Sequence, residues 1–381
     1  MTTSRVVWLM RMRSPEKVIS KSSVKTVRKI TNTSKYSSDH ELVSRGADMF
    51  NRRSFLKIIS GTAATSMVSP AMPGLVYAGS GMRTVIIGGG VAGIRAAARL
   101  QQFANSLDVT LIDPTMDLNT RKYTKINETL RYESAPVLSA AGIDVIAQKV
   151  VQVEPVSKRV QLANGASVEA DVLVFAPGVD FKTTSFTRSL VHPLNEALVL
   201  RQLESMQKGG VVVVGIPRAP YQYPQGPYVQ VSHMADYLRS HNRSAKILVL
   251  DHNVDSALAH VYRRQWKKGI GQRLVEWIGI NEGYIHDIDF DSNTINTVGG
   301  YIRAAVIAVM PEQQAGTIAR NAGLAVGTDW CQVDSQSFES VHYPDIYVLG
   351  DANDAAPNNK TAFTAMQQAD DFVRIMVDKI A

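Results

Sequence analysis

TVIIGGGVAGIRAAARL, residues 84–100, is an apolar run followed by a glycine turn and an alanine-rich segment of helical character. Its glycines follow the G-x-G-x-x-G spacing, which allows a tight turn, brings backbone N–H groups close to a pyrophosphate and lets the helix pack closely on the strand. The stretch therefore predicts a dinucleotide whose pyrophosphate lies at the helix N-terminus. The backbone groups expected there are those of Gly88, Gly90, Val91, Ala92 and Gly93.

A second apolar run and an acidic residue follow at the distance that this fingerprint requires. Residues 109–112 read VTLI, and Asp113 comes 20 residues after Gly93. An acid at this point binds the ribose hydroxyls of a dinucleotide. Glycines alone are weak evidence, because a glycine turn also occurs in ordinary α/β domains. The combination of strand, glycines, helix, second strand and acid favours a dinucleotide site with Asp113 at the ribose.

A second informative stretch lies near the end of the chain. Residues 345–352, DIYVLGDA, read as an apolar strand that ends in Gly350 and Asp351. Taken alone, this pair also fits a plain turn after a strand. Paired with the fingerprint, it resembles the strand that returns to the FAD domain in flavoproteins with two dinucleotide-binding domains, where the Asp binds the ribityl chain. The helix that follows is expected to point its N-terminus at the flavin and to start at Lys360, Thr361 and Ala362.

The middle of the chain predicts further strands beside the cofactor. Short alternating runs at 150–154, 159–162 and 167–169 predict a small antiparallel sheet, and the apolar run 171–178 closes in Ala-Pro-Gly. In FAD folds of this type such a strand ends next to the cofactor. Four residues of these strands are therefore expected at the FAD: Val151, Ala176, Pro177 and Gly178.

A second βαβ unit begins at residues 209–216, GGVVVVGI, and continues with a helix predicted for 228–240 and a strand for 246–251. Where a nicotinamide site needs a glycine turn, residues 217–228 read PRAPYQYPQGPY and contain four prolines. Proline has no N–H with which to bind a diphosphate. We interpret the unit as a Rossmann-like scaffold without a nicotinamide site, so that electrons enter from a small substrate.

The front of the chain has the pattern of a targeting sequence. Residues 51–57, NRRSFLK, form a twin-arginine motif, and the apolar stretch 58–68 behind it is too short to span a membrane. A cleavage site is expected after Ala78. We expect a twin-arginine signal peptide at 49–78 and a disordered stretch at 1–48, ahead of a start codon at Met49. The alternative is a basic start to a cytosolic protein.

The basic charge of the chain lies in this leader. The whole chain carries +7, but residues 1–78 hold 13 Lys or Arg against four Asp or Glu, which leaves −2 for the remainder. This distribution argues against nucleic-acid binding. Twin-arginine export carries folded proteins that already hold their cofactor, so the leader predicts a periplasmic location. We expect no membrane span and no metal site.

From about Met82 onward the chain resembles the flavin-binding subunit of flavocytochrome c sulfide dehydrogenase, and more distantly the sulfide:quinone oxidoreductases. The motifs that carry the resemblance are APYQYPQGPY at 219–228, WCQVD at 330–334 with FES at 338–340, and VLGDA at 348–352. The resemblance implies an α/β fold with two Rossmann-like dinucleotide-binding domains of the disulfide-reductase type. It also implies FAD, a small inorganic sulfur substrate and a c-type cytochrome subunit as electron acceptor.

Three departures from this family bear on the chemistry. The family links FAD to a cysteine whose position falls near Arg121 here, and no cysteine is present, so we expect non-covalent FAD with Arg121 beside it. Of the family's redox cysteine pair, the first position is Tyr223, which we expect to fill the pocket, and the second belongs to a C-terminal domain expected beyond Ala381. Cys331 matches neither position and is interpreted as a small buried apolar residue.

These predictions combine into a domain plan and a function. The FAD-binding domain is expected at 79–186 and 319–381, with the second Rossmann-like domain at 187–318 and the C-terminal domain absent. The expected function is a periplasmic FAD-dependent oxidoreductase of the sulfide-dehydrogenase type. Two alternatives stay open: a non-catalytic FAD-binding paralogue that acts as an assembly partner, and a truncated fragment of a sulfide dehydrogenase.

Overall fold

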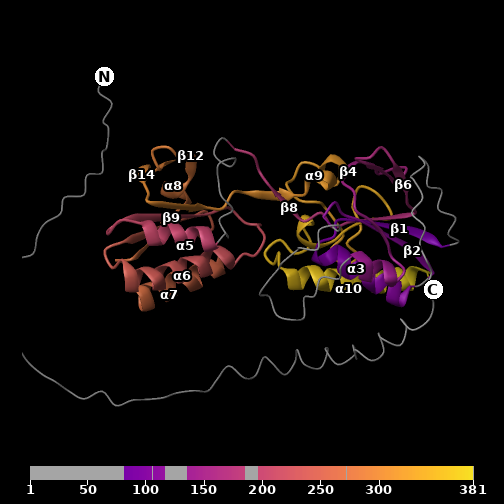
Figure 1. The fold of residues 1–381 in the computed structure, drawn as a ribbon, viewed down its shortest axis with the longest axis horizontal. Coiled ribbons are helices and arrows are strands. Elements are labelled where there is room, and N and C mark those ends of the chain that lie inside the picture. The colour runs from indigo at the N-terminus through magenta and orange to yellow at the C-terminus, as the bar shows by residue number, and fades with distance from the viewer. Residues whose placement is uncertain (1–80, 105, 116–134, 185–195, 272, 381) are drawn as a thin grey trace, which may run out of the picture. The chain divides into compact units, whose positions relative to one another are not determined.

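The chain has a mixed α/β fold built on two parallel sheets (Figure 1). The computed structural model describes residues 81–104, 106–115, 135–184, 196–271 and 273–380. The predicted leader at 1–78 and the predicted site residue Arg121 lie outside these ranges. The two parallel sheets confirm the predicted fold class, an α/β protein with two Rossmann-like units.

The first sheet has five parallel strands in the order β17-β7-β1-β2-β3. The chain therefore runs outward from β1 to β3 on one side and returns on the other side of β1. In a doubly wound sheet a ligand binds in the crevice outside the carboxyl end of the strand where this order reverses, which here is β1. The bounds are β1 (Met82–Ile87), β2 (Leu107–Ile112), β3 (Asp144–Ile146), β7 (Val172–Phe175) and β17 (Ile346–Val348).

Helices cover one face of this sheet and a small antiparallel sheet covers the other (Figure 1). Alternation along the strands makes this possible, because successive side chains point to opposite faces. Ile86 of β1 belongs to the core under the helices, whereas its neighbours Val85 and Ile87 belong to the core on the other face. The covering elements are α3 (Val91–Phe103) and α10 (Ala362–Ile380) on one face, and β4 (Val150–Glu154), β5 (Arg159–Leu162) and β6 (Ser167–Glu169) on the other.

The second sheet has four parallel strands in the order β11-β10-β9-β15, again with the first strand inside the sheet. Three helices cover one face and an antiparallel three-stranded sheet covers the other (Figure 1). The strands are β9 (Val211–Ile216), β10 (Lys246–Asp251), β11 (Val275–Gly279) and β15 (Val306–Val309). The covering elements are α5 (Glu196–Ser205), α6 (Gly226–His241), α7 (Ala257–Gln265), β12 (Ile285–Asp289), β13 (Thr294–Thr297) and β14 (Gly300–Arg303).

A short antiparallel pair, β8 with β16, lies at the two points where the chain passes between these sheets. The predicted domain boundaries at 186/187 and 318/319 stay predictions. None of the described helices has the length and apolarity needed to cross a membrane. The remaining elements are β8 (Val179–Phe181), β16 (Gln313–Ala315), α4 (Ala135–Ala140), α8 (Ile280–Gly283), α9 (Thr317–Asn321), the π-helix η2 (Trp266–Ile270) and the 3₁₀ turn η3 (Gly350–Ala352).

Most predicted elements have the observed bounds. The strands predicted at 150–154, 159–162, 167–169 and 246–251 are β4, β5, β6 and β10. The helix predicted for 228–240 starts two residues earlier, at Gly226, and includes Pro227 in its first turn. Proline is tolerated there because the first N–H groups of a helix have no intrahelical acceptor.

The apolar face of α10 contributes strongly to stability. Phe372 is fully buried and its ring centroid lies 4.9 Å from that of Tyr347, whereas Phe363 of the same helix is 62% exposed. We expect Phe372→Ala to lower the free energy of unfolding by about 3–5 kcal/mol. Phe363→Ala, the matched control, should change it by about 0.5 kcal/mol or less. Urea unfolding of both variants checks this, and equal losses would contradict the packing described here.

Candidate functional site

The glycine turn after β1 depends on two contacts that a side chain would block. Gly88 has φ +110°, and a Cβ at this position would lie 2.3 Å from the carbonyl oxygen of Ala176. A Cβ at Gly93 would lie 1.9 Å from the carbonyl oxygen of Gly88. The end of β1, the segment after β7 and the first turn of α3 therefore meet at backbone contact distance.

Gly90 differs from these two glycines, because its open side faces away from the protein. It is the N-cap residue of α3 in an extended conformation, and the nearest atom to a Cβ there is the Ala176 carbonyl oxygen at 3.9 Å. The first N–H groups of a helix have no intrahelical acceptor, and the helix dipole favours an anion beside them. The backbone N–H groups of Val91, Ala92 and Gly93, which we call the cradle, thus offer the polarity that a phosphate requires.

Asp113 stands at the edge of this cradle, directly after β2. Its buried carboxylate accepts a hydrogen bond from the Gly89 N–H at 2.7 Å, and from the N–H and hydroxyl of Thr115 at 2.8 Å and 2.5 Å. These bonds fix the carboxylate beside the turn. The placement agrees with the expectation for a ribose acid, and the role itself stays a prediction.

The segment after β7 closes one wall of the cradle. The Ala176 N–H bonds to the Ile87 carbonyl, and the Gly178 carbonyl accepts from the Gly316 N–H. Pro177 between them contacts Gly316, where a Cβ would lie 2.8 Å from the proline ring. Val151 lies on β4, at a register shift between Val150 and Gln152, its side chain is 49% exposed, and its place at the FAD stays a prediction.

Gly350 and Asp351 lie against the start of α3. Gly350 has φ +77°, a Cβ there would lie 3.2 Å from the Cβ of Ala92, and its N–H donates to Gln368 at 2.7 Å. The Asp351 carboxylate accepts from the side-chain amide of Gln222 at 2.6 Å. Burial raises the pKa of Asp351, and the Gln222 hydrogen bond and the charge of Lys360 oppose that shift. The two stretches that the sequence singled out therefore meet at one place.

Lys360 is a buried cation at this meeting point. Its Nζ donates to the carbonyl oxygens of Asp351 at 2.8 Å and Asn353 at 2.6 Å, and lies 3.9 Å from the ring centroid of Trp330. Burial lowers its pKa to about 8. Thr361 follows and caps α10, because its hydroxyl accepts from the Thr364 N–H at 3.2 Å. The helix then begins at Ala362.

Several backbone N–H groups of the proline-rich loop at 217–225 donate hydrogen bonds to other parts of the protein. The Ala219 N–H donates to the Asn253 side chain at 2.8 Å, and the Gln222 N–H to the Gln313 side chain at 2.7 Å. The N–H of Tyr223, a residue with φ +54°, donates to the Lys360 carbonyl at 2.8 Å. The loop therefore bonds directly to the segment that carries Asp351 and Lys360.

Asp251 is the last residue of β10 in the second sheet, close to the position that Asp113 has directly after β2 in the first. It is fully buried and accepts four hydrogen bonds: from the Tyr228 hydroxyl, the Trp277 indole N–H, and the N–H and side-chain amide of Asn253. A carboxylate offers about four acceptor positions. Groups of the protein itself therefore occupy all the hydrogen-bond acceptor positions of the Asp251 carboxylate.

Cys331 is fully buried close to Lys360. Burial raises the pKa of its thiol to about 12, although the Lys360 charge opposes the shift. A thiol of this kind is protonated at neutral pH and is a poor nucleophile. In the described part of the chain, no group of three or more His, Cys, Asp and Glu side chains is placed to bind a metal ion.

The sequence did not point to the polar residues that connect these segments. Gln368 accepts from the N–H of Gly350 and from the Asn353 side chain, and is 5% exposed. It stands between the apolar positions 365 and 372 on α10, so a glutamine on the buried face of an amphipathic helix was an available signal. Gln222, Asn253 and Gln313 form contacts between distant segments, for which no local pattern exists.

Comparisons with known proteins agree with this geometry. Residues 82–215 match the family model of the pyridine nucleotide-disulphide oxidoreductases. Residues 196–311 match the model described as sulfide dehydrogenase (flavocytochrome c) flavoprotein chain, central. Two successive parts of the chain, which overlap at residues 196–215, therefore each match the model of an oxidoreductase family.

Similar whole proteins come from bacteria and animals. The chain is 23% identical to the sulfide-quinone reductase of Aquifex aeolicus over 312 residues, which cover 73% of this chain and 70% of that protein. It is 18% identical to the mitochondrial sulfide:quinone oxidoreductase of Mus musculus over 311 residues, or 75% and 68% of the two chains. The solved sulfide:quinone oxidoreductase of Aquifex aeolicus superimposes with a TM-score of 0.64 at 20% identity, over 78% and 77% of the chains. This likeness shows a shared fold.

Gly90→Val tests the cradle. The residue has φ −78° and ψ −171°, an extended conformation that valine adopts readily, and the added side chain meets open space. We expect the variant to fold and to lose bound flavin. Gly93→Ala is the contrasting variant, because its methyl would meet the Gly88 carbonyl, and it should lose stability as well. Flavin absorbance and thermal melts separate the two effects, and a flavin-loaded Gly90→Val protein would contradict the cradle.

Cys331 should be unreactive in the folded protein. It is the only cysteine of the chain, so a thiol reagent such as DTNB reports on it alone. Because the thiol has a pKa of about 12 and is fully buried, we expect no reaction with DTNB at pH 8 in native buffer. In a denaturing concentration of urea, about 8 M, we expect one equivalent of thiol to react. Rapid labelling of the native protein would show an accessible thiolate and would contradict the interpretation of Cys331 as a buried, unreactive residue.

Proposed function

We propose that this chain is an FAD-dependent oxidoreductase that oxidises sulfide or a related small reductant. The observation that carries the proposal is the open cradle at Gly90, with Asp113 at one edge and Gly350 against the same helix start. The match to the two flavoprotein family models supports it. The names of the similar proteins support sulfide as the reductant.

The residues at this place fit an FAD molecule. The turn at 88–93 would bind the pyrophosphate, Asp113 the ribose, and Asp351 the ribityl chain. When bound, FAD supplies the two-electron redox chemistry, while the protein supplies binding, orientation and electrostatics. Lys360 and the N-terminus of α10 place positive charge beside Asp351, which favours negative charge on a neighbouring group. We propose that the FAD is held without a covalent bond.

The second sheet does not offer an equivalent cradle. Three backbone N–H groups of the loop, those of Ala219, Gln222 and Tyr223, already donate to acceptors within the protein. The acceptor positions of the Asp251 carboxylate are likewise occupied. We therefore propose that the chain binds no nicotinamide and receives its electrons from the small reductant. Oxidation of hydrosulfide to zero-valent sulfur releases two electrons and one proton, and two ferric haems of a c-type cytochrome would accept the electrons one each.

The twin-arginine motif at 51–57 supports a periplasmic location, to which the protein would be exported with its cofactor already bound. A c-type cytochrome partner fits this location and the flavocytochrome c description of the matched model.

A second candidate is an FAD-binding paralogue without catalytic activity that serves as an assembly partner. The observation that favours it concerns sulfur chemistry. Tyr223 stands where the family resemblance places a redox cysteine, and Cys331 is buried with a pKa of about 12. Thiol–disulfide exchange needs an attacking thiolate. The described residues do not supply one.

The first measurement is the visible spectrum of the purified protein before and after anaerobic sulfide. We expect flavin bands that sulfide bleaches, and that an oxidised c-type cytochrome restores. Bands that respond to dithionite and not to sulfide would favour the non-catalytic paralogue. A colourless protein would contradict the FAD assignment.

The same sample tests how the cofactor is held. After acid precipitation, flavin should appear entirely in the supernatant, because no covalent bond retains it. Colour that stays with the precipitate would contradict non-covalent binding. Gly90→Val serves as the control, since it should be colourless before any addition.

A further inference from the structure

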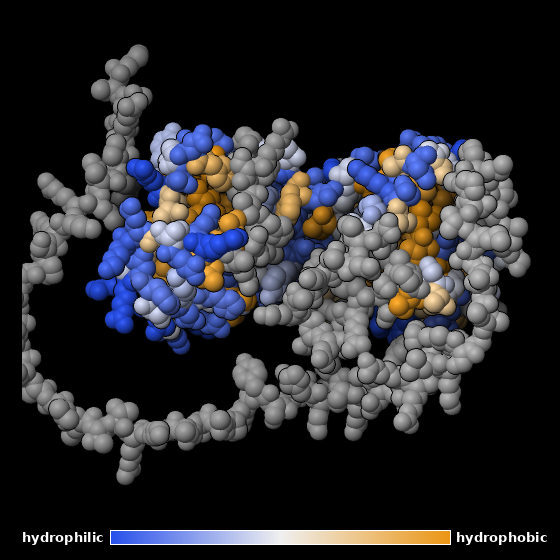
Figure 2. All heavy atoms as spheres, viewed as in Figure 1, coloured by the Kyte–Doolittle hydropathy of each residue, from blue (hydrophilic) through white to orange (hydrophobic). Residues whose placement is uncertain are grey.

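A strongly basic segment lies on the second sheet, far in sequence from the proposed FAD cradle. Residues 256–275, which include α7 and the π-helix η2, contain five Lys or Arg and no Asp or Glu. By contrast, residues 79–381 as a whole carry −2. Hydrophilic side chains gather over α6 and α7 in Figure 2. Positive charge is therefore concentrated on one part of an otherwise mildly acidic molecule.

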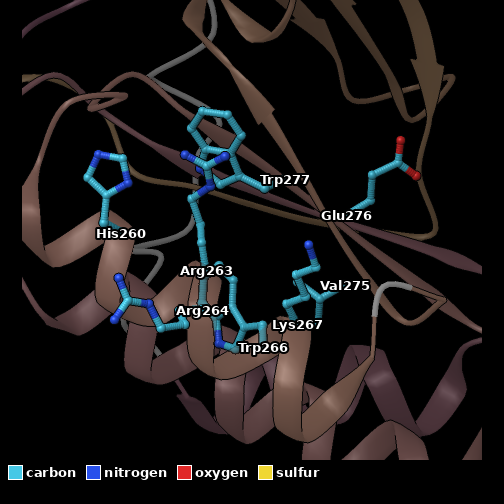
Figure 3. Close-up of a pocket in the computed structure, with 8 residues that line it drawn as sticks. All are labelled: His260, Arg263, Arg264, Trp266, Lys267, Val275, Glu276 and Trp277. Carbon is cyan, nitrogen blue, oxygen red and sulfur yellow. The ribbon is translucent and has the colours of Figure 1, made fainter.

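This segment borders a cavity of about 600 Å³ between α7, η2 and β11. Figure 3 shows His260, Arg263 and Arg264 of α7 with Lys267 of η2 around it, opposite β11. A volume of this size suits a small molecule. Three cationic side chains and a histidine thus line one concave site.

Trp277 of β11 holds one of these cations in place. The Arg263 guanidinium lies 3.6 Å from the centroid of the Trp277 ring, and the indole N–H donates to the buried Asp251 at 3.1 Å. The indole is therefore anchored, and the stacked guanidinium with it. A guanidinium fixed in advance loses little conformational freedom when an anion binds.

The cations of the cavity lack acidic partners among the described residues. Glu276 is the acid that lines the cavity, and it pairs with Lys246 at 2.7 Å. No ion pair in the described part of the chain involves Arg263, Arg264 or Lys267. Like charges held together repel one another, and a bound anion relieves that repulsion.

We propose that this cavity binds a small multivalent oxyanion of the phosphate class, such as a diphosphate group. One negative charge would leave most of the cluster unbalanced, whereas linked phosphates present several oxygens to Arg263, Arg264 and Lys267 at once. Arginine and lysine suit such oxygens as bidentate and point-charge donors. The site is separate from the Gly90 cradle, and it does not depend on the proposed sulfide oxidation.

The neighbouring pair Lys267 and Lys268 gives a matched test. Both are exposed lysines of η2, but only Lys267 lines the cavity. Calorimetric titration of the full chain with inorganic pyrophosphate should show saturable binding that weakens at higher salt. We expect Lys267→Gln to weaken this binding about tenfold and Lys268→Gln less than about twofold. Both variants lose one positive charge, but only Lys267→Gln removes a side chain that lines the cavity.

The outcomes separate the cavity from other anion sites. Tripolyphosphate that binds more tightly than pyrophosphate, and pyrophosphate more tightly than orthophosphate, would support a site for linked phosphates. Equal losses in Lys267→Gln and Lys268→Gln would mean unspecific attraction and would overturn the proposal, as would the absence of saturable binding. Thermal melts of both variants should match the unsubstituted chain. Reduction of the flavin by sulfide should be unchanged in both.

Discussion

The close approach of α3 to the end of β1 is the constraint on which the rest of the site depends. Gly93 admits no side chain, because a Cβ at this position would lie only 1.9 Å from the Gly88 carbonyl oxygen. This contact sets where α3 begins and leaves its first N–H groups at the carboxyl edge of the sheet. Gly350 then packs against Ala92 of the same turn. A shift of α3 would move the phosphate cradle and the Asp351 segment together.

The two halves of the protein share a Rossmann-like fold but differ in the residues at the ends of their first two strands. Asp113 directly follows β2, and Asp251 is the last residue of β10. In the first half the glycine turn leaves an open cradle beside Asp113. In the second half Tyr228, Trp277 and Asn253 saturate Asp251. The four hydrogen bonds to Asp251 occupy the acceptor positions that a ribose hydroxyl would need.

The second half contributes to the first through its proline-rich loop. Gln222 and Tyr223 bond to Asp351 and to the Lys360 carbonyl, so the loop that would otherwise bind a nucleotide orders the region proposed for the flavin. Lys360 adds a buried positive charge between the same segments. The charge of Lys360 therefore acts in this region without a reactive thiol beside it, because the nearby Cys331 stays protonated.

The sequence by itself determined many of the strands and helices and the glycine fingerprint of a pyrophosphate site, because strand alternation, helix periodicity and glycine spacing are local. It predicted β4, β5, β6 and β10 at their observed bounds, and it predicted a glycine turn at Gly88 and Gly93 with Asp113 after the next strand. The tertiary structure alone decided what lies far apart in the chain: the meeting of Gly350 with Ala92, the contact of Gln222 with Asp351, and the stacking of Arg263 on Trp277. Such contacts depend on how sheets and helices pack, and no local pattern encodes them.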